Sequence, residues 1–167
     1  MSDSMTSYSY VNGKITTTSE AVIAVNDIGL QRSYSVFDYI CTFNGNLFHF
    51  SDHYERFIRS AAELHLSPPL SCKEAEEIGI DLIEKSDLNK PALRLILTGG
   101  YSDSNSGIGN PNLIMIAEEL PSYPAEAYSK GAKLITVNFQ RELPRVKTTN
   151  YLNTFRLSDL KKEKGAL

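Results

Sequence analysis

Short runs of alternating apolar and polar residues open the chain, and two Asn-Gly pairs interrupt them. Asn12-Gly13 separates SYSYV from KITTT, and Asn44-Gly45 separates VFDYICTF from NLFHF. An alternation of this kind is typical of strands with one buried face. Asn-Gly tolerates the positive φ angles that a tight two-residue turn demands. The pattern therefore predicts two β-hairpins.

After the second hairpin the apolar residues recur at helical spacing. Ser51 is a candidate N-cap for a helix that extends to about Leu64 and has its apolar positions at Tyr54, Phe57, Ile58, Ala61 and Leu64. A second helix is predicted from Ser71 to about Ser86, because Glu74 completes a capping box. Its apolar face consists of Ala75, Ile78, Leu82 and Ile83.

The second half of the chain contains three apolar runs. ALRLILTG after Pro91 and NLIMIAE predict two buried strands on either side of a loop rich in Gly, Ser and Asn, Gly99–Pro111. LPSYPAEAYSKG resembles a linker, because its two prolines discourage regular structure. AKLITVNF predicts a further strand, and the segment from Asn150 to Lys164 suits a helix.

This order of strands, helices and strands predicts an α+β domain, in which two helices cover one face of an antiparallel sheet. We expect this domain to occupy residues 1–119 and a linker to occupy residues 120–131. Residues 132–167 then begin a second domain. One strand, one loop and one helix are too little to enclose a core, so we expect this second domain to be incomplete.

Composition removes several classes of function. The chain has 167 residues, of which 41% are hydrophobic, and a formal net charge of −3 without a basic stripe, which argues against nucleic acid as a partner. The start has no signal-peptide pattern and no stretch of about 18 apolar residues occurs, so we expect neither export nor membrane insertion. The two cysteines and three histidines lack metal-ligand spacing, which predicts no metal site and suits a reduced, cytoplasmic protein.

Two basic residues are candidates for chemistry. Lys147 lies in PRVKTTNYL, after a predicted strand and ahead of a predicted helix. By itself it is most simply a solvated surface lysine. Arg56 lies on the first predicted helix, where its planar fork suits a phosphate, although pairing with a glutamate of the same helix is the simpler interpretation.

Two long segments resemble the class-IV aminotransferases, the superfamily of branched-chain and D-amino-acid aminotransferases. DIGLQRSYSVFDYICTFNGNLFHFSDHYERF has an Asp-x-Gly start, a Val-Phe-acidic triplet, an Asn-Gly turn and a His-x-x-Arg helix. KGAKLITVNFQRELPRVKTTNYLNTFRL has the linker end, the strand that follows it and a Lys-x-x-Asn element. The ordered agreement extends from about Val11 to the last residue.

This resemblance implies pyridoxal 5'-phosphate as the cofactor, with Lys147 as the lysine that holds it as a Schiff base and moves protons during the reaction. It places Arg56 on the phosphate and Phe37 at the substrate pocket. Arg94 falls on an arginine that some branched-chain members keep near the substrate carboxylate, and a solvent-facing strand residue is an equal alternative. The implied partners are an amino acid, a 2-keto acid and a second copy of the chain.

Departures from the family pattern refine these expectations. Where the D-amino-acid enzymes have an arginine that binds the α-carboxylate, this chain has Gly99, which argues against D-amino-acid specificity, and Phe37 is more similar to the branched-chain members. The family's glutamate for the pyridine nitrogen would lie after residue 167, so we expect the chain to be catalytically incomplete. Two alternatives stay open: an aminodeoxychorismate lyase, and a non-catalytic binding or dimerisation module.

Overall fold

The structure is a computed structural model that describes residues 5–101 and 107–166. The chain forms two compact units. The first contains the chain up to Leu120 together with a short returning segment, Arg145–Thr149, and the second contains Pro121–Pro144 and the residues from Asn150 onward. The returning segment is important because it carries Lys147.

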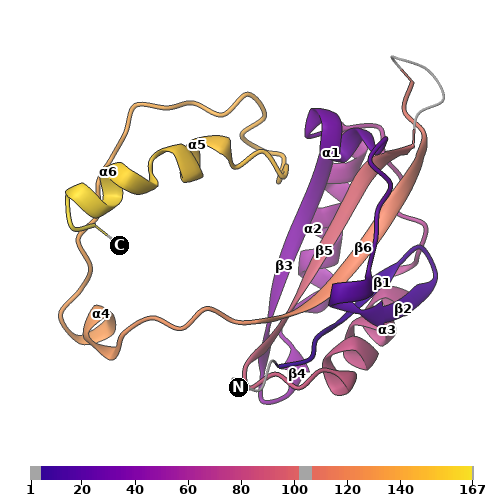
Figure 1. Cartoon of the computed structure of the whole chain (residues 1–167), viewed down its shortest axis with the longest axis horizontal. Helices are drawn as coiled ribbons and strands as arrows, with labels where there is room; N and C mark the ends of the chain where they lie inside the picture. Colours follow the sequence, from indigo (N-terminus) through magenta and orange to yellow (C-terminus); the bar gives the residue numbers. More distant parts are fainter. Residues whose placement is uncertain (1–4, 102–106, 167) are drawn as a thin grey trace. The chain divides into compact units, whose positions relative to one another are not determined.

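The first unit is built on a six-stranded antiparallel sheet in the order β2-β1-β6-β5-β3-β4 (Figure 1). Its strands are β1 Tyr8–Val11, β2 Lys14–Thr17, β3 Ser35–Phe43, β4 Asn46–Leu47, β5 Pro91–Tyr101 and β6 Asn110–Glu119. Both predicted hairpins are confirmed, and all four residues of the Asn-Gly turns have positive φ angles. Of the run NLFHF, however, only two residues are in β4.

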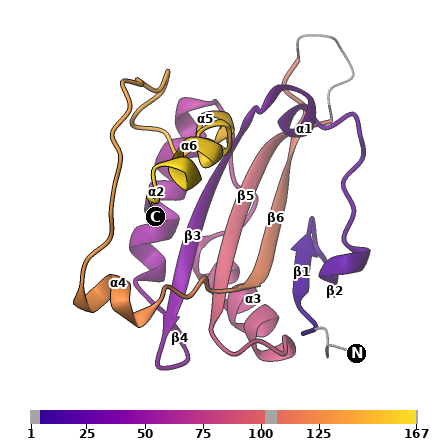
Figure 2. The same cartoon turned by 60° about the vertical axis from the view of Figure 1, so that its left-hand side comes forward.

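Two long helices, α2 Phe50–Glu63 and α3 Cys72–Lys85, lie on one face of this sheet (Figure 2). Their buried side chains, among them Tyr54, Phe57 and Leu82, form one core with apolar residues of β3, β5 and β6. This confirms the predicted fold class, in which two helices cover one face of an antiparallel sheet.

The starts of the two helices differ from each other. Ser71 caps α3 as predicted: its hydroxyl accepts from the Glu74 amide, and the Glu74 side chain accepts from the Ser71 amide. The predicted cap at Ser51 is wrong, because α2 begins one residue earlier and His49, with a φ of 51°, precedes it without a side-chain cap. The assignment of Ile58 to the buried face is also wrong, since this residue is 43% exposed.

A short helix, α1 Ile28–Arg32, lies at one end of the sheet and is fastened there by a buried carboxylate (Figure 1). Asp27 caps the helix by accepting from the amides of Gly29 and Leu30. Its other oxygen accepts from the Thr98 hydroxyl of β5 and from the Asn112 side chain of β6, both at 2.6 Å. These four bonds satisfy the buried charge and join α1 to the sheet.

The second unit corrects three expectations. The linker contains a short helix, α4 Ala125–Ser129, which begins directly after Pro124, a position where the ring of proline does no harm. Residues 132–139 form no strand, since none of the residues that the structure describes pairs with them and a strand needs a partner for its backbone groups. The predicted C-terminal helix is divided at Leu157 into α5 Leu152–Arg156 and α6 Ser158–Glu163.

Two further observations complete the fold. A 3-10 turn, Thr18–Glu20, follows β2. The predicted loop Gly99–Pro111 is shorter than expected, because β5 extends to Tyr101 and β6 begins at Asn110, and its residues 102–106 lie outside the described residues. Within the described residues, no helix has both the length and the apolarity to cross a membrane.

The two serines provide a paired test of the helix starts. Ser71→Ala should lower the free energy of unfolding by about 1 kcal/mol, because it removes the hydroxyl that caps α3. Ser51→Ala should change it by less than about 0.5 kcal/mol, because Ser51 is an exposed residue inside α2. Urea unfolding of both variants measures this, and an equal loss in the two would contradict the described start of α2.

Candidate functional site

Lys147 is fastened to the first unit by its backbone and by its neighbours. The side chain of Val146 is buried in the core, with 3% exposure. The Lys147 amide donates to the Ser60 hydroxyl of α2 at 3.2 Å, and its carbonyl accepts from the Phe37 amide of β3 at 2.9 Å. The Thr149 amide donates to the Ser35 carbonyl at 3.1 Å. The segment therefore pairs with β3 like a short additional strand.

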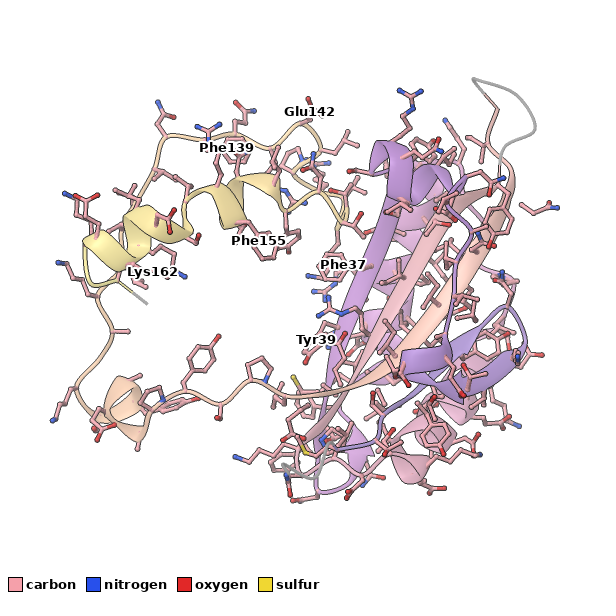
Figure 3. All side chains as sticks on the ribbon, in the orientation of Figure 1. Phe37, Tyr39, Phe139, Glu142, Phe155 and Lys162 are labelled. Carbon is pink, nitrogen blue, oxygen red and sulfur yellow. The ribbon has the colours of Figure 1, made fainter. Side chains whose placement is uncertain are left out.

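The side chain of Lys147 leaves this segment over an aromatic ring. Its Nζ lies 4.3 Å from the centre of the Phe37 ring. Phe37 is 8% exposed and projects from the same face of β3 as Tyr39, the face opposite α2 and α3 (Figure 3). In the part of the chain that the structure describes, no carboxylate oxygen lies within 4.0 Å of this ammonium group. A cation–π contact thus holds the lysine.

Arg56 is held by a carboxylate on the other face of β3. Asp38 accepts from Arg56 Nε at 2.8 Å and from Nη2 at 2.7 Å, a bidentate pair. Asp38 is completely buried, whereas the Arg56 side chain is 46% exposed. The arginine therefore has a fixed orientation and can still be reached from solvent.

His53 completes this cluster, since its Nδ1 lies 2.8 Å from Asp38 Oδ1. Burial raises the pKa of Asp38, but hydrogen bonds from Arg56, His53 and the Tyr39 amide outweigh this, so the pKa lies below its ordinary value of 3.8. An ionised carboxylate can only accept, so His53 Nδ1 carries the proton of this bond. Asp38 thus orients two side chains of α2.

The lysine and arginine segments meet at α2. Ser60, which accepts from the Lys147 amide, lies four residues after Arg56 and therefore on the same side of the helix. Phe37, which pairs with the Lys147 backbone, precedes Asp38, the partner of Arg56. Three separate stretches of the sequence thus come together at the edge of β3.

Arg94 lies on β5, on the same face of the sheet as Phe37 and Tyr39. Its Nε and Nη2 donate to the two carboxylate oxygens of Glu118 on β6 at 2.6 and 2.9 Å. Its guanidinium carbon lies 4.9 Å from the centre of the Tyr39 ring and 5.6 Å from that of Phe37. The alternative expectation, that Arg94 only faces solvent, does not account for its contacts with Glu118 and the two aromatic rings.

Phe37 links these groups, since the side chains of both Lys147 and Arg94 lie over its ring. Ser60, Tyr39 and Glu118 had no signal in the sequence, and Asp38 was marked only as the acidic residue of the Val-Phe-acidic triplet, without its partner Arg56. Glu118 is one of two adjacent glutamates at a strand end, and only the pairing of β5 with β6 brings it to Arg94. A pairing with a glutamate of the same helix, of the kind weighed for Arg56, is formed by Arg59, which binds Glu55.

Comparison with known proteins identifies the chain's relatives. The family model described as amino-transferase class IV matches residues 35–166. A putative branched-chain-amino-acid aminotransferase of Methanocaldococcus jannaschii is 30% identical over 153 residues, which are 87% of this chain and 52% of that protein. A D-alanine aminotransferase of Staphylococcus aureus is 32% identical over 104 residues, 62% of this chain and 37% of that protein.

Solved structures show the same fold. The branched-chain amino acid aminotransferase of Escherichia coli superposes with a TM-score of 0.80 at 23% identity, covering 96% of this chain and 58% of that one. The branched-chain aminotransferase from Thermoproteus uzoniensis with norvaline gives 0.79 at 21% identity, with 96% and 58% covered. The chain therefore spans between about a third and three fifths of the length of these relatives.

The charge of Asp38 makes a prediction for stability. Asp38→Asn should lower the free energy of unfolding by about 1–3 kcal/mol at about pH 7, because it weakens the charge-assisted bonds to Arg56 and His53. The folded-state pKa of Asp38 is lowered, so its stabilisation is fully present above 3.8 and is lost as the pH falls through the lower folded-state value. The difference between the two proteins should therefore shrink in strong acid.

Denaturant unfolding at several pH values measures this difference. Asp52→Asn is the matched control, because Asp52 pairs with His49 at an exposed position and should change the free energy by less than about 1 kcal/mol. A difference between parent and Asp38→Asn that grows on acidification would contradict the assignment.

Proposed function

The chain belongs to the class-IV aminotransferases, and on this premise we propose that the whole protein transfers an amino group between an amino acid and a 2-keto acid with pyridoxal 5'-phosphate. Branched-chain-like substrates are favoured over D-amino acids, because Gly99 stands where the D-amino-acid enzymes have a carboxylate-binding arginine. The relatives named above include both kinds. The single observation that carries the proposal is the fastening of Lys147 over Phe37.

Lys147 suits a group that carries an aldehyde. Its backbone is held by two hydrogen bonds and by the buried side chain of Val146, so the position of its Cα is well defined. Its side chain is half-buried on an aromatic ring, with no carboxylate of the described residues within ion-pair distance. An amine with these surroundings can serve as a nucleophile and can hold or move a proton at Nζ.

Arg56 suits the phosphate of the same cofactor. Asp38 accepts hydrogen bonds from Nε and Nη2 of Arg56, which fixes the plane of the guanidinium group and offsets its charge. Arg56 would therefore act on a phosphate by directed hydrogen bonds more than by net charge. Asp38 and His53 are positioning residues in this proposal, since they act through Arg56.

Both groups lie beside the edge of β3 where the Lys147 segment pairs, and pyridoxal 5'-phosphate would use Lys147 toward its aldehyde and Arg56 toward its phosphate. When bound, this cofactor supplies a pyridine ring that stabilises negative charge at the α-carbon of the substrate. Lys147 Nζ would take the proton from that carbon and deliver it to C4′ of the cofactor. Phe37 would form one wall of the substrate pocket, and Arg94 would lie on the substrate side of that wall.

The finer expectations remain proposals. The known relatives are longer than this chain, so we propose that the 167-residue chain alone is catalytically incomplete and binds the cofactor weakly. We propose a homodimer in the cytoplasm for the whole protein. Release of pyruvate without a keto-acid acceptor would instead identify an aminodeoxychorismate lyase. Absence of both activities would favour a binding or dimerisation module.

Substitution of the lysine tests the proposal directly. In the whole protein, Lys147→Ala should abolish keto-acid-dependent amino transfer and the visible absorbance of the lysine-bound cofactor. Thermal unfolding should change little, because a half-exposed lysine contributes little to stability. Lys133→Ala, at an exposed position of the second unit, is the control and should retain full activity. Turnover in the Lys147 variant would refute the assignment.

The phosphate assignment has a test of its own. Arg56→Gln should weaken binding of pyridoxal 5'-phosphate by about 10- to 100-fold, because a charge-assisted hydrogen bond is lost. Binding of pyridoxal, which has no phosphate, should weaken much less. Arg59→Gln, three residues further along α2, removes the same charge and should change the binding of neither compound. Equal weakening for both compounds in the Arg56 variant would mean that Arg56 only supports the fold.

A further inference from the structure

The arginine beside the candidate site already holds a carboxylate. Arg94 and Glu118 lie on neighbouring strands and on one face of the sheet, because Arg94 is opposite Ile116 and Glu118 is two residues further on. Their two hydrogen bonds, at 2.6 and 2.9 Å, form the side-on fork with which arginine binds a carboxylate of any origin. Glu118 thus occupies Arg94 in the way that a ligand carboxylate would.

The same arginine lies beside Lys147. Both cations lie over the ring of Phe37, with Arg94 Cζ at 5.6 Å and Lys147 Nζ at 4.3 Å from its centre. Their separation therefore cannot exceed the sum of these two distances. Lys147 and Arg94 thus contact the same ring, and a short molecule attached to the lysine can extend a second group toward Arg94.

The position of Arg94 is fixed from two directions. The Tyr39 ring lies against the guanidinium group, with its centre 4.9 Å from Arg94 Cζ, while Glu118 accepts hydrogen bonds from Nε and Nη2. Burial and the negative charge of Glu118 raise the pKa of Tyr39, against the opposite effect of Arg94, which agrees with the close packing of these three side chains. Glu118 and the two aromatic rings thus contact the guanidinium group together.

We propose that Glu118 is a specificity-determining residue, which competes for Arg94 with the carboxylate of a bound molecule and so biases the site beside Lys147 toward uncharged substrate side chains. The proposal rests on the proposed function for its biological meaning. In physical terms, the carboxylate of a bound molecule replaces that of Glu118 on the guanidinium group of Arg94.

The exchange has a limited strength. The side chains of Arg94 and Glu118 are 32% and 29% exposed, so water screens part of their attraction. A pair of this kind should weaken the binding of a second carboxylate to Arg94 several-fold and should not prevent it. Glu118 therefore adjusts preference between substrates.

Reductive labelling of the 167-residue chain tests this without cofactor or turnover. The chain is treated with 4-oxobutanoate or with butanal, its uncharged counterpart, in the presence of cyanoborohydride. The lysine amine condenses with the aldehyde and releases water, and hydride from cyanoborohydride reduces the imine to a secondary amine. Mass spectrometry then gives the ratio of anionic to neutral labelling at Lys147, with exposed Lys133 as an internal reference.

Glu118→Gln should raise this ratio by about 3- to 10-fold, because Arg94 becomes available to the carboxylate of 4-oxobutanoate. Arg94→Gln should lower it, since Glu118 then stays as an unpaired negative charge beside the lysine. The two substitutions of a charged residue by glutamine thus change the labelling ratio in opposite directions. A loss of folded structure would not produce this result. Thermal unfolding of each variant checks the fold.

Two further variants make the result specific. Glu118→Gln combined with Arg94→Gln should show no increase over the parent. Glu119→Gln, which removes the same charge from the adjacent residue that binds the amides of Asn89 and Lys90, should leave the ratio unchanged.

An unchanged ratio in Glu118→Gln overturns the proposal, and so does an equal rise in the double variant or in Glu119→Gln. Absence of labelling at Lys147 by both aldehydes also overturns it, because the site would then not admit such molecules. Because no cofactor takes part, failure here leaves the Lys147 and Arg56 assignments to be judged by their own experiments.

Discussion

The candidate site depends on the pairing of one short segment with the edge of β3. β4 covers this edge only opposite Thr42 and Phe43, which leaves the backbone groups nearer the start of β3 available. The returning segment uses them, through the bonds of Phe37 with Lys147 and of Ser35 with Thr149. An exposed strand edge is a template for further pairing, and here it determines where the lysine lies. Without this pairing, nothing in the sheet would direct Lys147 toward Phe37.

A second constraint follows from the alternation of side chains along β3. Phe37 and Tyr39 project to one face, while Asp38 projects between them to the other, beneath α2. A buried carboxylate is stable only when it is well bonded, and α2 supplies Arg56 and His53 for this purpose. Three consecutive residues of β3 therefore serve both faces of the sheet. One face presents an aromatic wall to Lys147, and the other presents an oriented guanidinium group.

The parts of the fold that the sequence predicts correctly are those with local causes. Asn-Gly turns and the capping box of α3 are decided by residues within a few positions of each other, and both are confirmed. The start of α2 was missed because Ser51 offers a capping hydroxyl, but the chain turns into the helix at His49 through a left-handed conformation instead. The strand expected at residues 132–139 is wrong for a different reason, since an apolar run forms a strand only where another strand is available to pair.

The site shows the same limit at longer range. The resemblance to a family marked Lys147, Arg56, Phe37 and Arg94, but it carried no information on what holds them in place. Ser60 and Lys147 are 87 positions apart, and Arg94 and Glu118 are 24 apart. Such pairs have no periodicity and no motif, and only the strand order and register bring them together. Positioning residues are therefore the part of a site that a single sequence conceals most.

Charge pairing distinguishes the roles of the three basic residues at this site. Arg56 and Arg94 are each bound side-on by a carboxylate, one of them completely buried and the other partly exposed. The buried partner, Asp38, is shielded from exchange, so its arginine keeps one orientation whatever molecule approaches. The exposed partner, Glu118, is screened by water, and in our proposal the carboxylate of a bound molecule replaces it on Arg94. Lys147 has an aromatic ring in place of a carboxylate as its neighbour. The two arginines thus share one bidentate geometry and differ in how deeply the carboxylate that binds them is buried.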